Sequence, residues 1–217
     1  DSSRGHETVI SSTVLGLGMK KVAPLKRTKI NVGDEIYALG SFGNGPALSL
    51  RILLGLKETK FPEKLFLPTV KFLKSVKYIK ASIDVSDGLA SSLCVLSELN
   101  KVSFDVDIPE NFFSAESVQF CDEVGIPHAA LFFAEHGDYQ LLVAVDPKKR
   151  QKFLKSYPQA QKLAVASAKR KAFRFKNQNK EWVVFDLDFL YKAPKSTLAL
   201  LRKSFQSWLK IARSANL

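Results

Sequence analysis

Between residues 79 and 99 the spacing of apolar side chains changes from two residues to the spacing of a helix. Apolar and polar residues alternate over 79–85, which predicts a half-buried strand. Leucines then recur at helical intervals over 88–99, which predicts an amphipathic helix. Asp84, Ser86 and Asp87 therefore fall where a strand passes into a helix, with two carboxylates and a hydroxyl within four positions.

The same two periodicities recur along the rest of the chain. Strands are predicted over 8–18, 35–40, 102–108, 137–145, 162–168, 172–175 and 182–185, and helices over 47–56, 114–125, 146–157 and 196–215. Ser114 is expected to cap the second of these helices. Because strands and helices interleave without a strict βαβ repeat, the sequence predicts an α+β fold, a mixed β-sheet with helices packed on it.

Composition narrows the partners of this chain. Its 33 Lys and Arg against 21 Asp and Glu give a formal net charge of +12, which favours anionic partners such as nucleotides, phosphorylated metabolites or nucleic acid. Its two cysteines form neither a disulfide framework nor a zinc site, which fits a reducing cytoplasm. Since no apolar run approaches the roughly 18 to 20 residues that span a bilayer, no membrane contact is expected.

The strand–helix junction admits two interpretations. Ser or Asp before a helix is an ordinary N-cap. Asp84 and Asp87 can equally bind Mg²⁺, which takes one or two carboxylates together with phosphate oxygens and water. A glycine turn over 40–45 can also offer backbone N–H groups to a phosphate, although its spacing matches neither the dinucleotide fingerprint nor the P-loop.

Several motifs resemble those of a known family. The stretch "IDVSDGLASSL" resembles the Asp-rich motif of thiamine-monophosphate kinase, a member of the ATP-binding superfamily that includes aminoimidazole ribonucleotide synthetase, selenophosphate synthetase and a hydrogenase-maturation factor. "VISSTVLG", "VGDEIYALGSFGNGPALSLRILL" and "GDYQLLVAV" resemble further stretches of that kinase in the same order, over about residues 1–145. The resemblance implies the C-terminal domain fold of this superfamily and a role in thiamine biosynthesis.

The resemblance also assigns roles to individual residues. It implies that Asp84 and Asp87 bind Mg²⁺, that Ser86 contacts ATP and that Asp1 is a further metal ligand. Arg27, six residues before a Gly-Asp pair, matches an arginine that contacts ATP, and a guanidinium suits a polyphosphate.

One motif departs from the family pattern. The family's "GGEDYE" becomes "EHGDYQ", so that Gly137 stands where a glutamate binds the thiamine substrate. Asp138 remains at its substrate-binding position, and a structural role before a strand is its other interpretation. The sequence therefore supports the use of ATP and Mg²⁺ better than it supports thiamine phosphate as the acceptor.

The resemblance predicts two domains. Residues 1–20 match the last strand of an N-terminal ATP-binding domain whose remainder is absent, and residues 21–217 match the C-terminal α+β domain. In the family the N-terminal domain supplies further metal-binding aspartates and the dimer interface, so we expect a homodimer for a complete protein and no activity for this chain alone.

The sequence thus predicts the C-terminal part of an ATP- and Mg²⁺-dependent kinase that acts on a small phosphorylated substrate. Two alternatives stay open: a different acceptor within the same superfamily, or a non-catalytic module that binds nucleotides or nucleic acid through its basic C-terminal face, which includes the basic stretches 146–155 and 166–180.

Overall fold

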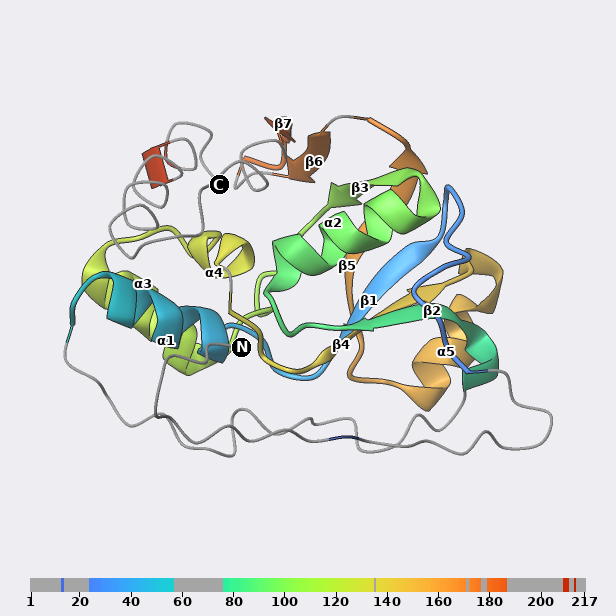
Figure 1. Ribbon diagram of the computed structural model, residues 1–217, viewed down its shortest axis with the longest axis horizontal. Helices are drawn as coiled ribbons and strands as arrows, with labels where there is room; N and C mark the ends of the chain where they lie inside the picture. Colours follow the sequence, from blue (N-terminus) through green and yellow to red (C-terminus); the bar gives the residue numbers. More distant parts are fainter. Residues whose placement is uncertain are drawn as a thin grey trace.

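The computed structural model describes residues 13, 24–56, 76–134, 136–170, 172–176, 179–186, 209–210 and 213. Within them lies one mixed sheet in the order β2-β4-β1-β5-β3-β6-β7 (Figure 1). Its strands are β1 (Glu35–Leu39), β2 (Ile79–Asp84), β3 (Val102–Val106), β4 (Leu141–Val145), β5 (Gln161–Ala168), β6 (Ala172–Lys176) and β7 (Trp182–Asp186). Neighbouring strands are antiparallel except β3 and β6, which are parallel.

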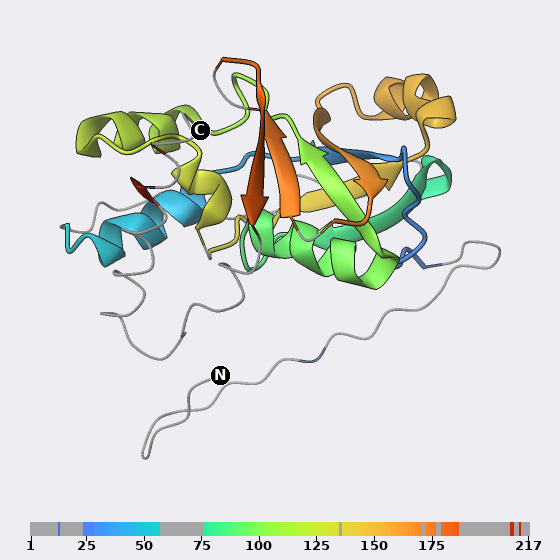
Figure 2. The same ribbon diagram turned by 90° about the horizontal axis from the view of Figure 1, so that it is seen from above.

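Helices cover both faces of this sheet. They are α1 (Asn44–Leu53), α2 (Leu89–Asn100), α3 (Ala115–Val124), α4 (Ala130–Phe133) and α5 (Arg150–Ser156), with short 3₁₀ turns η2 (Val76–Tyr78) and η3 (Pro147–Lys149). Figure 2 shows α2 and α5 on opposite sides of the strands. The predicted α+β fold, a mixed sheet with helices packed on it, is confirmed.

Alternate residues of β1 belong to two different cores, as the period of two requires. Ile36 and Ala38 pack in the larger core, which also contains the buried side chains of α1 to α4. Tyr37 and Leu39 pack in the smaller core against Phe153 of α5. The central strands are therefore buried on both faces.

Most predicted elements lie where the sequence placed them, and the deviations have local causes. The helix predicted over 47–56 begins earlier, at Asn44, because Gly43 adopts a positive φ of 105° and turns the chain directly into α1. The strand predicted over 137–145 begins only at Leu141, and α4 was not predicted. Ser114 caps α3 as predicted, since its side chain accepts a hydrogen bond from the backbone N–H of Ser117.

Some predictions fall outside the described residues. These are the strand over 8–18, the domain division at residue 20 and nearly all of the helix over 196–215. Cys94 and Cys121 are both buried, and they form no disulfide in the described part of the chain. None of the helices in the described ranges has the length and apolar character needed to cross a bilayer.

Candidate functional site

The junction between β2 and α2 carries the predicted site. Asp84 ends β2, and the chain turns through Ser86 and Asp87 to Gly88, the N-cap of α2. Gly88 has a φ of 90° and a ψ of 164°, and no side chain caps the helix. Ser86 Oγ instead donates to a carboxylate oxygen of Asp87 at 3.3 Å. The capping interpretation of this junction is therefore wrong.

An uncapped helix start has a chemical consequence. The first N–H groups of a helix have no partner inside the helix and carry the positive end of its dipole. The start of α2 thus offers donors beside the exposed carboxylates of Asp84 and Asp87. Such donors suit a phosphate oxygen.

The structure brings Arg27 to this junction. The nearest guanidinium nitrogen of Arg27 lies 3.1 Å from Oδ1 of Asp84, and both side chains are about half exposed, at 52% and 50%. The Arg27 backbone is held in place because its carbonyl accepts a hydrogen bond from Asn100 Nδ2 at 2.9 Å. One residue earlier, the carbonyl of Lys26 accepts from the N–H of Ser82 on the edge strand β2 at 3.0 Å. The connector before β1 is therefore docked along β2.

The two carboxylates fit the needs of a magnesium ion that arrives with a nucleotide. Within the described part of the chain, no group of three or more His, Cys, Asp or Glu side chains is placed to hold a metal alone. Mg²⁺ does not require such a cage, because it commonly uses one or two carboxylates with substrate phosphates and water. Asp84 and Asp87 supply that number, while Asp1 lies outside the described residues.

Residues 136–140 close the back of the junction. The N–H of Val85 donates to the carbonyl of Gln140 at 2.8 Å, and the N–H of Tyr139 donates to the carbonyl of Val85 at 2.9 Å. A Cβ atom on Gly137 would lie 2.2 Å from the carbonyl oxygen of Val85 and 2.3 Å from that of Ser86. No side chain fits at position 137 while the junction keeps this backbone.

Asp138 is fully buried and binds the glycine turn. Its carboxylate accepts from the N–H of Gly43 at 2.9 Å and from that of Gly45 at 2.8 Å. Burial raises the pKa of Asp138, and these backbone hydrogen bonds offset only part of that rise. The geometry gives Asp138 the role of an anchor for the turn that starts α1. Because Asp138 takes both N–H groups, they do not cradle a phosphate.

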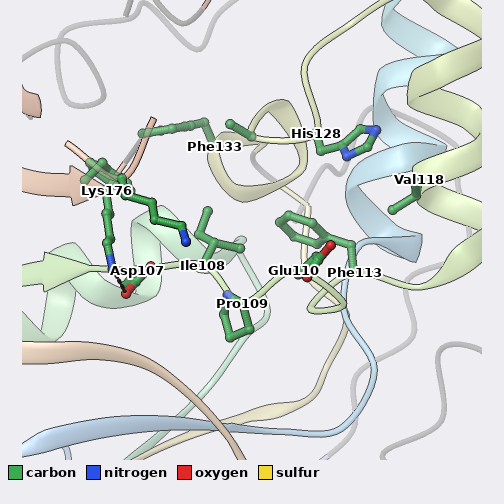
Figure 3. Close-up of a pocket in the computed structure, with 12 residues that line it drawn as sticks. Asp107, Ile108, Pro109, Glu110, Phe113, Val118, His128, Phe133 and Lys176 are labelled. Atoms are coloured by element: carbon green, nitrogen blue, oxygen red, sulfur yellow. Dashed lines mark hydrogen bonds and ion pairs between the residues drawn. The ribbon is translucent and has the colours of Figure 1, made fainter. Parts of the chain in front are cut away.

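A separate cleft of about 620 Å³ lies between the β3–α3 connection, α3, α4 and β6 (Figure 3). Phe113, Phe133 and Phe175 are among the residues that line it. The individual residues predicted for metal, nucleotide or substrate binding do not lie in its wall, namely Arg27, Asp84, Ser86, Asp87, Gly137 and Asp138. The site that motifs indicate and the cleft that the fold forms are thus different places.

Comparisons with known proteins agree with this fold. No family model matches the chain. Thiamine-monophosphate kinase from Aquifex aeolicus (strain VF5) is 33% identical over 135 residues, which cover 57% of this chain and 43% of that relative. The predicted resemblance to thiamine-monophosphate kinase is confirmed. The chain spans less than half the length of this curated relative.

Solved structures show the same fold at lower identity. The crystal structure of thiamine monophosphate kinase from Aquifex aeolicus superimposes with a TM-score of 0.53 and 24% identity, over 73% of this chain and 54% of that one. HypE from E. coli, a hydrogenase maturation protein, gives a TM-score of 0.56 and 18% identity, over 76% and 52% of the two chains. This chain therefore shares its fold with about half of each of these proteins.

Proposed function

We propose that this chain is part of an ATP- and Mg²⁺-dependent phosphotransferase similar to thiamine-monophosphate kinase. The observation that carries the proposal is the junction itself, where Asp84 and Asp87 flank an uncapped helix start and Arg27 lies 3.1 Å from Asp84. The sequence similarity to a thiamine-monophosphate kinase supports it. So does the shared fold with two solved structures, one of HypE in complex with ATP and one of a kinase complexed with AMPPCP and TMP.

Asp84 and Asp87 would hold Mg²⁺ in this proposal. The ion would neutralise the charge of the nucleotide phosphates and fix their orientation. Asp84 is paired with Arg27 on a half-exposed surface, so exchanging this partner costs little, on the order of 0 to 1 kcal/mol. Arg27 is then able to turn from the carboxylate to the polyphosphate, which its planar fork of donors suits.

The remaining groups position the phosphates. The hydroxyl of Ser86 and the first N–H groups of α2 would donate to phosphate oxygens at the positive end of the helix. Phosphoryl transfer depends mainly on alignment and charge stabilisation, so neither a nucleophilic side chain nor a covalent enzyme intermediate is needed. We infer that an oxygen of the acceptor phosphate attacks the γ-phosphorus of ATP directly, while the bond from this phosphorus to the β,γ-bridging oxygen breaks and ADP leaves.

The acceptor is proposed to be a small phosphorylated metabolite. Thiamine phosphate is expected to be a poor one, because Gly137 lacks the carboxylate that the resemblance places there, and the carbonyls of Val85 and Ser86 leave no room for a side chain. A screen of phosphorylated acceptors with a complete protein tests this. Efficient use of thiamine phosphate would contradict the reading of "EHGDYQ" as a loss of substrate contact.

Nucleotide binding by the chain itself provides the first test. We expect calorimetry to detect weak binding of AMPPCP that requires Mg²⁺. With ATP we expect binding without transfer, because the resemblance places the remaining metal ligands in another domain. Asp84→Asn and Asp87→Asn should each weaken binding by about tenfold, as expected for the loss of a charged ligand. The matched control is Asp122→Asn, an exposed aspartate paired with His128 away from the junction.

Two outcomes would contradict the proposal. One is binding that is equal with and without Mg²⁺, and the other is an equal loss in Asp84→Asn and Asp122→Asn. In a complete protein, Asp84→Asn should abolish ATP turnover with little change in stability, because the ion pair that the Asp84 side chain makes with a described residue is the exposed one with Arg27.

A further inference from the structure

The cleft beside α3 and α4 has the size and lining of a small-molecule site. Its volume of about 620 Å³ lies within the roughly 300 to 1,000 Å³ typical of ligand pockets. Figure 3 shows Phe113, Glu110 and Ile108 near its centre, with Phe133, His128 and Val118 around them. The cleft combines apolar walls with a few charged groups, as ligand sites do.

Its aromatic walls are already fixed in place. Phe133 and Phe175 pack with ring centroids 5.2 Å apart, and Phe113 meets Phe112 edge to face at 5.1 Å. Phe113 also pairs through its backbone with Phe42, next to the glycine turn. Phe133 and Phe175 are only 6% and 2% exposed, whereas Phe113 is partly exposed and presents most of the open aromatic surface. This preformed surface favours a flat, apolar ring, because such a ring stacks on Phe113 or meets it edge to face with little loss of conformational freedom.

The charged groups of the cleft determine which polar substituent a bound ring should carry. Lys176 Nζ lies 3.0 Å from a carboxylate oxygen of Asp107, so these two charges neutralise each other. His128 is engaged by Asp122 at 2.8 Å. Lys180 also lines the cleft and makes no hydrogen bond or ion pair with any other described residue. Glu110 likewise makes none, and it lines the cleft next to Phe113. Its carboxylate can only accept, so it selects a donor.

We propose that this cleft binds a small molecule made of a flat aromatic ring that carries an amino group, with the ring against Phe113 and the amino group on Glu110. This goes beyond the proposed phosphotransfer, because no cleft residue belongs to the junction of Asp84 and Asp87. Binding of a ligand in this cleft is therefore tested independently of nucleotide binding at the junction.

Two matched probes test the proposal on the 217-residue chain. They are 2-aminoquinoline, which has the ring and the donor, and 2-methylquinoline, which has the same size without the donor. Binding is followed by NMR shifts of isotope-labelled backbone amides, without nucleotide or metal. For a ligand of this size we expect a dissociation constant of about a millimolar or below for the amino compound, and binding about tenfold weaker for the methyl compound.

Two pairs of variants locate the probe. Val118→Trp should fill the cleft and abolish binding, whereas Gln119→Trp, one position along α3 and outside the lining, should leave binding unchanged. Glu110→Gln should weaken 2-aminoquinoline about tenfold and leave 2-methylquinoline unaffected, whereas Glu116→Gln, an exposed glutamate outside the lining, should change neither.

The proposal is overturned if 2-aminoquinoline shifts no amides near Phe113 and Phe133, or if it binds Val118→Trp as well as it binds the unmodified chain. Equal affinities for the two probes would overturn the role of Glu110. Because nucleotide is absent, these results are distinct from a failure of Mg²⁺-dependent ATP binding at the junction.

Discussion

Replacing Asp138 by alanine should destabilise the fold strongly, although Asp138 lies in a motif associated with substrate. The change leaves the N–H groups of Gly43 and Gly45 without the acceptor that now lies 2.8 to 2.9 Å away. A buried donor left unpaired costs about 1 to 3 kcal/mol, so the two together cost about 2 to 6 kcal/mol. Removing a buried carboxylate returns part of this, because burial raises its pKa and so disfavours its charged form.

We therefore expect Asp138→Ala to lower the free energy of unfolding by about 2 to 4 kcal/mol. Urea unfolding followed by circular dichroism measures this change as a lower midpoint at unchanged slope. The exposed Asp122→Ala is the control and should change stability by about 1 kcal/mol or less. If the two variants were equally stable, the anchoring role of Asp138 would be refuted.

The same carboxylate gives a pH signature. Because its pKa is raised on folding, the native state binds the proton more tightly than the unfolded state above the ordinary value of 3.8. The contribution of Asp138 to stability therefore falls as the pH rises through the window between 3.8 and its native value. Asp138→Ala should lack this decline, and an unchanged pH profile in the variant would argue against the burial of a titrating group here.

Further changes test the surrounding frame. Gly137→Ala should cost about 2 to 4 kcal/mol in urea unfolding, because its Cβ would meet rigid backbone, whereas Gly125→Ala, with a φ of 65° and open space, should cost about 1 kcal/mol. Burial acts to raise the pKa of Glu35, but hydrogen bonds from Arg150 and Tyr37 outweigh it and hold that pKa below 4.5. The stabilisation by Glu35 is thus present above pH 4.5 and lost as the pH falls below it, so Glu35→Gln should flatten the acid limb of a stability profile. If the stability of Glu35→Gln fell with decreasing pH as steeply as that of the unmodified chain, this role of Glu35 would be contradicted.

Local pattern predicted the elements but not their partners. The change of period at 79–99 located β2 and α2 within a residue or two, because burial on one face imposes these spacings. Arg27 and Asp84 are 57 positions apart in the sequence, and no local sequence pattern indicates that they pair. The hydrogen bond from Gly43 to Asp138 spans 95 positions. The motif around Asp138 was therefore visible in the sequence, but its hydrogen bond to the glycine turn was not.

The residue types of the candidate site made its position predictable but left its role open. Asp84, Ser86 and Asp87 are visible as polar residues at a strand end, but an N-cap and a metal site share that composition. The structure distinguishes these two interpretations, because it places Gly88 at the N-cap position of α2, where no side chain caps the helix. The cleft was not predicted, because its wall combines residues from four separate segments of the chain.

Paramagnetic Mn²⁺ locates a bound cation directly, because it broadens the NMR signals of nearby amides and prefers the oxygen ligands that suit Mg²⁺. With AMPPCP and a low concentration of Mn²⁺, the amides of residues 84–89 should disappear first, while those of β7 persist. In Asp84→Asn and Asp87→Asn this local broadening should be lost. Broadening that begins elsewhere in the chain, or that stays the same in the two variants as in the unmodified chain, would contradict a metal–nucleotide site at the β2–α2 junction.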